Sequence, residues 1–291
     1  MNKITKELIN DSSFDFFSSY LDIDLRENRL IYQELVSTTK DIIKNSLERA
    51  KKNLEEGHYK GSQCAEEISN LYDHEIKNYY NYLNAHSYIS QNKTDFEKMA
   101  IIATGGYGRG KISPGSDIDL LFLMPFKKTA WAESIAENLL YFLWDLGLKI
   151  GHATRNINEC LTLSSKDQTI TTSLLDARYI CGDKEVKNVF DKKFRNTISR
   201  RSPGDFITAK LEERETRHIK EGQSRYLVEP NVKNGKGGLR DLESLSWMTN
   251  FCYEAPRPEQ MLKMEFLLNL KQKLLEDVKI SFGILDANCI F

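Results

Sequence analysis

Two carboxylates at the start of an apolar segment are the residues best suited to chemistry. Asp117 and Asp119 stand two positions apart, where the run Ile118–Met124 predicts a buried strand. Side chains at positions i and i+2 of a strand share a face, so both carboxylates are expected to project together. Like charges this close are best tolerated with a cation between them, and oxygen ligands favour Mg²⁺ or Mn²⁺ over zinc. The pair therefore predicts a magnesium or manganese site.

A glycine-rich segment precedes this pair. The apolar run Ala100–Thr104 predicts another buried strand, and it is followed by a turn with glycine at positions 105, 106, 108 and 110. Such glycines expose backbone N–H groups and leave room for a phosphate chain. Taken alone, a glycine turn is common, and an Asp-x-Asp at a strand start is often only a cap. Together they favour metal-assisted phosphoryl or nucleotidyl transfer.

The combined segment resembles a known superfamily. A Gly-Gly turn after an apolar strand, followed about ten residues later by Ser-Asp-x-Asp, resembles the signature of the DNA polymerase β-type nucleotidyltransferases. The stretch GGYGRGKISPGSDIDLLFL is similar to the uridylyltransferase part of the bifunctional PII uridylyltransferase/uridylyl-removing family. A second stretch, LVEPNVKNGKGGLRDLESLSW, is similar to the block that follows the nucleotidyltransferase core in that family. The resemblance covers roughly residues 25–270.

This resemblance implies an α/β (α+β) fold. It predicts a polymerase β-type nucleotidyltransferase core with a mixed sheet over residues 96–185, after an N-terminal helical region over 1–95. A helical substrate-side region would follow over 186–291 and would be truncated relative to the family. By periodicity, the region from about Leu25 to Gln91 reads as helices broken at Gly57 and Gly61, and the region from about Thr162 to Arg225 reads as helical and charged.

The resemblance also implies an activity and a set of site residues. The reaction would be transfer of UMP from UTP to a tyrosine of the nitrogen-regulatory PII protein, with release of pyrophosphate. Asp117 and Asp119 would be catalytic and would hold Mg²⁺ or Mn²⁺. The backbone of Gly105 and Gly106, together with Ser116, would hold the triphosphate. Arg109 or Lys111 would neutralise its negative charge.

The sequence departs from the superfamily on the next strand, expected over Leu148–Arg155. That strand usually carries a third acidic residue, but here it carries Gly151 and His152. Asp176 is the first candidate to replace the missing carboxylate as a metal ligand. Its simpler interpretation is a cap, or an ion-pair partner for Arg178.

Three further features have alternative interpretations. His152 is either a hydrogen-bonded structural residue or a base, and Arg155, on the opposite face of the strand, either contacts the triphosphate or pairs with Glu159. The glycines between Lys233 and Arg240 form a basic loop before a helix expected near residue 241. This loop is either an anion site or a tight turn with solvated lysines.

Composition narrows the class of protein. The 291 residues carry a formal net charge of −1, so the sequence lacks the basic field typical of nucleic-acid binders. Its five cysteines are scattered with no C-x-x-C pair, which favours reduced thiols in a cytoplasmic protein. No apolar run approaches the roughly 20 residues of a membrane span. The expected partners are therefore UTP and PII, with neither nucleic acid nor membrane.

Two alternatives stay open from the sequence. One is a nucleotidyltransferase with a different donor or acceptor, and the other is a catalytically inactive module that binds PII or a nucleotide. The five histidines include no His-Asp dipeptide, so we expect no uridylyl-removing hydrolase activity in this chain. The sequence motifs do not specify the base of the donor nucleotide, the effector regulation, the oligomeric state or the origin of the C-terminus.

Overall fold

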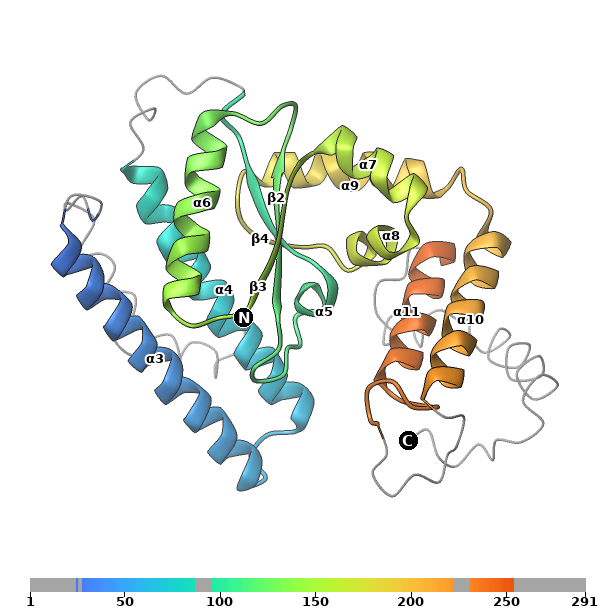
Figure 1. Ribbon diagram of the computed structural model, residues 1–291, viewed down its shortest axis with the longest axis horizontal. Helices are drawn as coiled ribbons and strands as arrows, with labels where there is room; N and C mark the ends of the chain where they lie inside the picture. The colour runs from blue at the N-terminus through green and yellow to red at the C-terminus, as the bar shows by residue number, and fades with distance from the viewer. Residues whose placement is uncertain (1–24, 26–27, 87–95, 222–230, 254–291) are drawn as a thin grey trace. The chain divides into compact units, whose positions relative to one another are not determined.

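The computed structural model describes residues 25, 28–86, 96–221 and 231–253 (Figure 1). The chain divides into two compact units between Thr197 and Ile198. The first unit contains a four-stranded mixed sheet with helices, which confirms the predicted α/β class. The functional boundaries at residues 95 and 185 stay predictions. Among the described helices, none is both long and apolar enough to cross a bilayer.

The sheet places its two most apolar strands in the middle. The strand order is β3-β2-β1-β4, with β1 antiparallel to both of its neighbours and β2 parallel to β3. The bounds are Ala100–Ala103 for β1, Ile118–Met124 for β2, Ile150–Asn156 for β3 and Arg178–Gly182 for β4. Every residue of β1 is buried, as is every residue of β2 except Asp119. The continuous apolar runs therefore become central strands, as strands covered on both faces do.

Strand β4 corrects the sequence interpretation. It falls inside the region from Thr162 to Arg225 that was read as helical, and only five residues form it. A strand this short carries little periodicity of its own, and its pairing with β1 across the chain decides its conformation. Strand β3 also begins two residues later than expected, at Ile150.

Three long helices complete the core of the first unit. They are α3 (Arg29–Glu55), α4 (Gly61–Ala85) and α6 (Ala130–Asp145). Helices α4 and α6 lie side by side against the sheet, and α3 packs on α4 (Figure 1). Their buried side chains join those of β1 and β2 in one hydrophobic cluster. The tyrosine-rich stripe of α4 belongs to this core, where the rings of Tyr79 and Phe142 stack with centroids 3.9 Å apart.

Local signals set the ends of these helices. Thr129 caps α6 by accepting a hydrogen bond from the Ala132 N–H, and Gly147 adopts φ +82° just beyond its end. The predicted amphipathic helix after Pro125 is thereby confirmed. Gly57, at φ +75°, lies in the turn between α3 and α4, where the sequence predicted a break.

The other helices that the structure describes up to residue 198 are shorter. They are α5 (Gly105–Gly108), α7 (Ile157–Lys166), α8 (Gln168–Leu175) and α9 (Lys184–Ile198). Asp167 separates α7 from α8, because its carboxylate accepts hydrogen bonds from the Thr169 and Ile170 N–H groups and so caps the second helix. This break directs α8 back toward the glycine turn at α5, which it contacts.

The second unit is built on α10 (Pro203–Lys220) and α11 (Leu239–Tyr253). The side chain of Asp241 accepts hydrogen bonds from Arg217 at 2.5 Å and from the Gly237 N–H at 2.8 Å. Buried His218 lies 3.1 Å from the same carboxylate. The described part of the basic glycine loop is therefore folded onto the chain's own carboxylate, which favours the tight-turn interpretation over an anion site.

A buried carboxyl on α4 makes stability depend on pH. The Glu75 side chain is 1% exposed, and neither of its oxygens has a hydrogen-bond partner within the part of the chain that the structure describes. Burial raises the pKa of Glu75 to about 7 from an ordinary value of 4.5. The folded state therefore binds more protons than the unfolded state between these pH values, and stability falls as pH rises through that window.

We expect Glu75→Gln to stabilise the fold by about 3 kcal/mol above neutral pH, with little effect near pH 4.5. The amide keeps the shape of the side chain but cannot ionise. Urea unfolding of both proteins across this range measures the difference, with exposed Glu66→Gln on the same helix as the control. Parallel pH profiles for wild type and Glu75→Gln would contradict the assignment.

Candidate active site

Asp119 lies between two glycine backbones. It is the second residue of β2 and stands in register with Gly151 of β3. A Cβ atom on Gly151 would come within 2.3 Å of Asp119 Oδ1, and one on Gly105 would come within 3.0 Å of Oδ2. A contact of 2.3 Å does not occur for a real Cβ atom and one of 3.0 Å is uncommon, so glycine at both positions makes room for the carboxylate. Gly151, one of the two residues noted where the sequence lacks a third acid, therefore stands directly beside Asp119.

Asp117 brings a second negative charge to this position. It is exposed and precedes β2 by one residue. The pKa of Asp119 is raised, first by burial and then by the charge of Asp117. The structure thus brings together the two carboxylates that the sequence paired. Their repulsion is the kind that a bound cation relieves.

The glycine turn is fixed to the same strand. The turn expected after β1 is a single helical turn, α5, in which Gly105 has φ +55°. The Thr104 N–H donates to the Asp119 carbonyl oxygen at 3.0 Å, which ties the turn to β2. Gly108 approaches another segment so closely that a Cβ there would lie 2.1 Å from the Asp176 carbonyl oxygen. The glycines therefore permit close backbone packing on both sides of the turn.

Asp176 holds the turn through an arginine. Its carboxylate, 6% exposed, accepts a hydrogen bond from Arg109 Nη1 at 2.6 Å. Across the described ranges, no group of three or more His, Cys, Asp or Glu side chains is arranged to hold a metal ion. In the structure Asp117 therefore lies near Asp119, but Asp176 does not form a group of metal ligands with them. Its role as a metal ligand stays a prediction.

A second ion pair braces the turn from α4. An ion pair with Asp176 was one interpretation offered for Arg178, but its guanidinium instead binds both carboxylate oxygens of Asp73. The same carboxylate accepts a hydrogen bond from the buried Tyr107 hydroxyl at 2.6 Å, and Arg178 Nη2 also donates to the Tyr107 carbonyl oxygen at 3.2 Å. Asp73 was not identified from sequence, because 105 residues separate it from Arg178.

A pocket of about 260 Å³ opens beside Asp119. Its wall comes from the ends of β1 and β2, from β3 and from α8. The polar residues on it are Thr104, Asp119, His152, Arg155, Thr169 and Ser173. The α8 residues were missed because nothing in their local sequence distinguishes them from an ordinary helix face. These residues are positioned by the start of α8, which the Asp167 side chain caps.

The pocket includes both uncertain residues of β3. Arg155 and His152 were expected on opposite faces of β3, which is the edge strand of the sheet, yet both line the pocket. His152 is exposed, and its ring meets the edge of Trp144 with centroids 6.0 Å apart. Lys111 and Ser116 are also exposed. Of the site residues predicted from the sequence, only Asp119 is on the described wall of the pocket, which does not include Asp117, Gly105, Gly106, Arg109, Lys111 or Ser116.

Comparisons with known proteins agree with this geometry. Residues 87–178 match the nucleotidyltransferase domain family, and residues 205–280 match the GlnD PII-uridylyltransferase family. Two curated relatives, from Caulobacter vibrioides strains NA1000 / CB15N and ATCC 19089 / CIP 103742 / CB 15, are each named bifunctional uridylyltransferase/uridylyl-removing enzyme. Each is 46% identical over 229 residues, which is 77% of this chain and 24% of the relative.

The chain therefore spans about a quarter of the length of the curated relatives that it matches. The matched residues include the glycine turn, both carboxylates and the block around α10 and α11. These matches confirm the resemblance found in the sequence: the chain is similar to the bifunctional uridylyltransferase/uridylyl-removing enzymes, and part of it matches the nucleotidyltransferase domain family.

Proposed function

We propose that this chain transfers UMP from UTP to a tyrosine hydroxyl of a PII signalling protein and releases pyrophosphate. The observation that carries the proposal is the half-buried Asp119 carboxylate, held between two glycines beside Asp117 at the wall of a pocket. The names of the relatives support the choice of a uridylyl donor. We expect this reaction to take place in the cytoplasm.

The residues present fit a divalent cation of the Mg²⁺ or Mn²⁺ type. Both side chains offer carboxylate oxygens, and the pKa of Asp119 is raised, first by burial and then by the negative charge of Asp117. Two protein carboxylates are a usual share for magnesium, which takes its remaining ligands from substrate phosphates and water. When bound, such a cation offsets charge on the transferring phosphoryl group and on the leaving pyrophosphate.

The chain's own residues would hold and orient the nucleotide. Gly105 and Gly106 let the backbone approach the triphosphate, and Ser116 is the proposed third element of that cradle. A Cβ on Gly106 would lie 3.6 Å from Arg109 Nη2, so the guanidinium held by Asp176 lies against the turn where phosphate charge would accumulate. Arg155 supplies a further cation from the pocket wall.

The reaction is a displacement at the α-phosphorus. The tyrosine oxygen forms a bond to this phosphorus as the bond to the bridging oxygen breaks, and the electron pair leaves with pyrophosphate. The tyrosine proton passes to a base or to solvent. Catalysis of this kind relies on positioning and on electrostatic stabilisation, both of which the fixed carboxylates and the braced turn would provide.

One observation favours a rival of a different class. The described residues lack a third carboxylate beside Asp117 and Asp119, which is what a nucleotide-binding module without turnover would show. A transferase with another donor is also consistent with these two side chains, since neither reads a base. Both rivals are separated from the proposal by direct assay.

The test is transfer of label from α-phosphate-labelled UTP to purified PII, with Mg²⁺ or Mn²⁺ present. UTP, ATP, CTP and GTP are compared as donors, and Asp117→Asn/Asp119→Asn serves as the inactive control. Label that appears on PII only with UTP, and disappears in the double variant, is the expected result. Binding of UTP without any label on PII would favour the inactive module.

We expect Asp119→Asn to lower the rate of transfer roughly a thousandfold or more, because the amide removes a charge on which the cation depends. The fold should persist and, without metal, gain thermal stability at neutral pH, since the half-buried charge and its repulsion with Asp117 are both removed. Turnover and melting temperature are measured on the same samples. Near-normal turnover would remove the metal assignment.

We expect Gly151→Ala to lower kcat/KM roughly a hundredfold while the strand still forms. The new methyl group would stand 2.3 Å from Asp119 Oδ1 and must displace the carboxylate. The matched control is Gly61→Ala, at the start of α4, where a Cβ would meet nothing within 4 Å. If both alanine variants were equally active, the packing of Asp119 against β3 would have no part in the reaction.

A further inference from the structure

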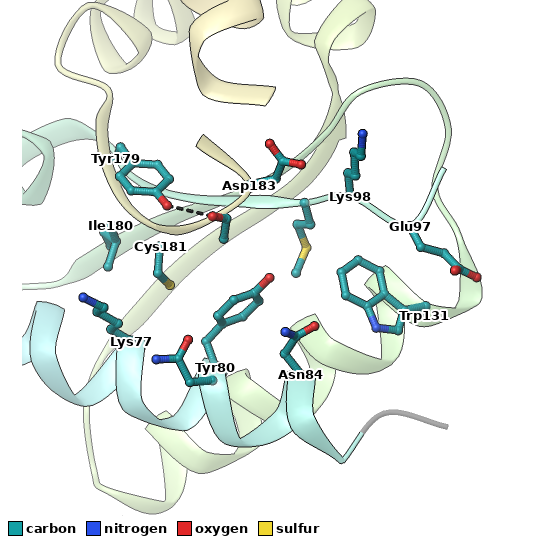
Figure 2. Close-up of a pocket in the computed structure, with 13 residues that line it drawn as sticks. Lys77, Tyr80, Asn84, Glu97, Lys98, Trp131, Tyr179, Ile180, Cys181 and Asp183 are labelled. Atoms are coloured by element: carbon teal, nitrogen blue, oxygen red, sulfur yellow. Dashed lines mark hydrogen bonds between the residues drawn. The ribbon is translucent and has the colours of Figure 1, made fainter. Parts of the chain in front are cut away.

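Two features of the first unit have no part in the reaction proposed above. One is a cavity of about 490 Å³ lined by residues of α4, α6 and β4 (Figure 2). Its charged side chains are two lysines and two carboxylates, Lys77, Lys98, Glu97 and Asp183. These charges balance, so the cavity favours neither an anion nor a cation. The other feature is a group of exposed aromatic side chains on α6 and β3.

This aromatic patch consists of Tyr141, Trp144 and His152. Tyr141 and Trp144 are 60% and 45% exposed, and their rings meet edge to face with centroids 5.7 Å apart. The rings of Trp144 and His152 meet in the same way at 6.0 Å. The other large apolar side chains of α6 are buried. Large rings that gather in solvent, on a helix that otherwise buries its apolar side chains, indicate a surface that a partner covers.

The patch lies at the same end of the sheet as Asp119. In the register of β3 with β2, His152 pairs with the residue after Asp119, and it also belongs to the wall of the pocket there. The segment that follows Trp144 is bonded to the start of β2, because the Ile118 N–H donates to the Lys149 carbonyl oxygen at 2.8 Å. The aromatic patch is therefore continuous with the pocket through His152.

The end of α6 that carries the patch is held in place. The Asp145 carboxylate, next to Trp144, accepts a hydrogen bond from the Tyr32 hydroxyl of α3 at 2.7 Å. Gly147, at φ +82°, then ends the helix. A surface fixed in this way loses little conformational entropy when a partner binds to it.

The charges around the patch favour a basic partner. Between the start of α6 and the start of β3, the charged side chains are all exposed, and they are Glu133, Glu137, Asp145 and Lys149. Three carboxylates against one lysine leave this surface negative. Glu137 stands four residues before Tyr141, so its charge lies on the same face of the helix as the ring. Aromatic faces also attract lysine and arginine side chains.

We propose that the aromatic patch is the docking surface for the acceptor protein, which binds it through a segment that carries basic and apolar side chains near the acceptor tyrosine. This inference rests on the proposed function, in which a protein brings a tyrosine hydroxyl to the carboxylate pair. The pocket beside Asp119 has a volume of only about 260 Å³, whereas a stable protein interface covers about 800 Å² on each partner. Most contacts with the acceptor must therefore lie outside the pocket, and the patch adjoins it. Tryptophan and tyrosine are the side chains that most often dominate the binding energy of such interfaces.

A second exposed aromatic pair offers a matched control. Phe96 and Phe126 are 49% and 58% exposed, and their ring centroids lie 5.5 Å apart. Phe126 comes after the end of β2, whereas Asp119 lies near its start, so about 20 Å of extended chain separates the two. The proposal predicts that the aromatic patch contributes to acceptor binding and that this pair does not.

The test is the binding of purified PII to the full chain, measured by isothermal titration calorimetry. Mg²⁺ and a non-hydrolysable UTP analogue are present, so that no transfer occurs. Trp144→Ala and Tyr141→Ala are compared with Phe126→Ala, and melting temperatures establish that each variant is folded. Transfer assays with UTP then give the KM for PII and the KM for UTP separately.

We expect the Kd for PII to rise at least roughly tenfold in Trp144→Ala, to rise less in Tyr141→Ala and to stay unchanged in Phe126→Ala. The KM for UTP should be unchanged in all three variants, and added salt should weaken the binding of PII to wild type. Docking at the patch is overturned if both patch variants bind PII as wild type does, if Phe126→Ala weakens binding as much, or if wild type does not bind PII at roughly 0.1 mM.

The outcomes also separate this proposal from the proposed function. If PII binds at the patch but receives no label from UTP, the proposed reaction is wrong and the docking surface stands. If PII receives label and its KM is the same in wild type and in both patch variants, the reaction stands and the docking surface is wrong.

Discussion

The site depends on one steric constraint, which is that a half-buried carboxylate occupies the space between two glycine backbones. Asp119 is the one residue of β2 that is not buried, and its two oxygens face Gly151 and Gly105. Any side chain at either glycine would compete with the carboxylate for the same volume. The register of β2 with β3 and the course of the chain after β1 must both be correct for this arrangement to exist.

Ion pairs that span the sequence hold that arrangement. Asp176 fixes Arg109 on one side of the glycine turn, and Asp73 fixes Arg178 and the buried Tyr107 on the other. Partly buried pairs add little net stability, because desolvation offsets most of their attraction, but breaking one leaves a charge uncompensated. Their main effect here is to fix the geometry. The N-terminal helix α4 thus belongs to the machinery that shapes the turn.

Local patterns predicted the parts of the site whose cause is local. The bounds of β2, the stop at Gly147 and the pairing of Asp117 with Asp119 follow from apolar runs, from glycine geometry and from the i, i+2 rule. Asp176 and Arg178 were offered as possible partners of each other, but Asp176 pairs with Arg109 and Arg178 with Asp73, because these acids and bases meet only through tertiary packing. Strand β4 and the α8 wall were missed for the same reason. The family resemblance is the basis of the proposed uridylyl transfer, because residue spacing alone indicated no more than phosphoryl or nucleotidyl transfer.

The most direct measurement is Mn²⁺ binding, followed by electron paramagnetic resonance in the presence of a non-hydrolysable UTP analogue. We expect tight Mn²⁺ binding by wild type that weakens at least roughly tenfold in Asp119→Asn and in Gly151→Ala, since one removes the ligand charge and the other displaces it. Gly61→Ala should bind as wild type does. Equal Mn²⁺ affinity in wild type and in Asp117→Asn/Asp119→Asn would show that the carboxylate pair has no part in holding the cation, and the proposed metal site would then be wrong.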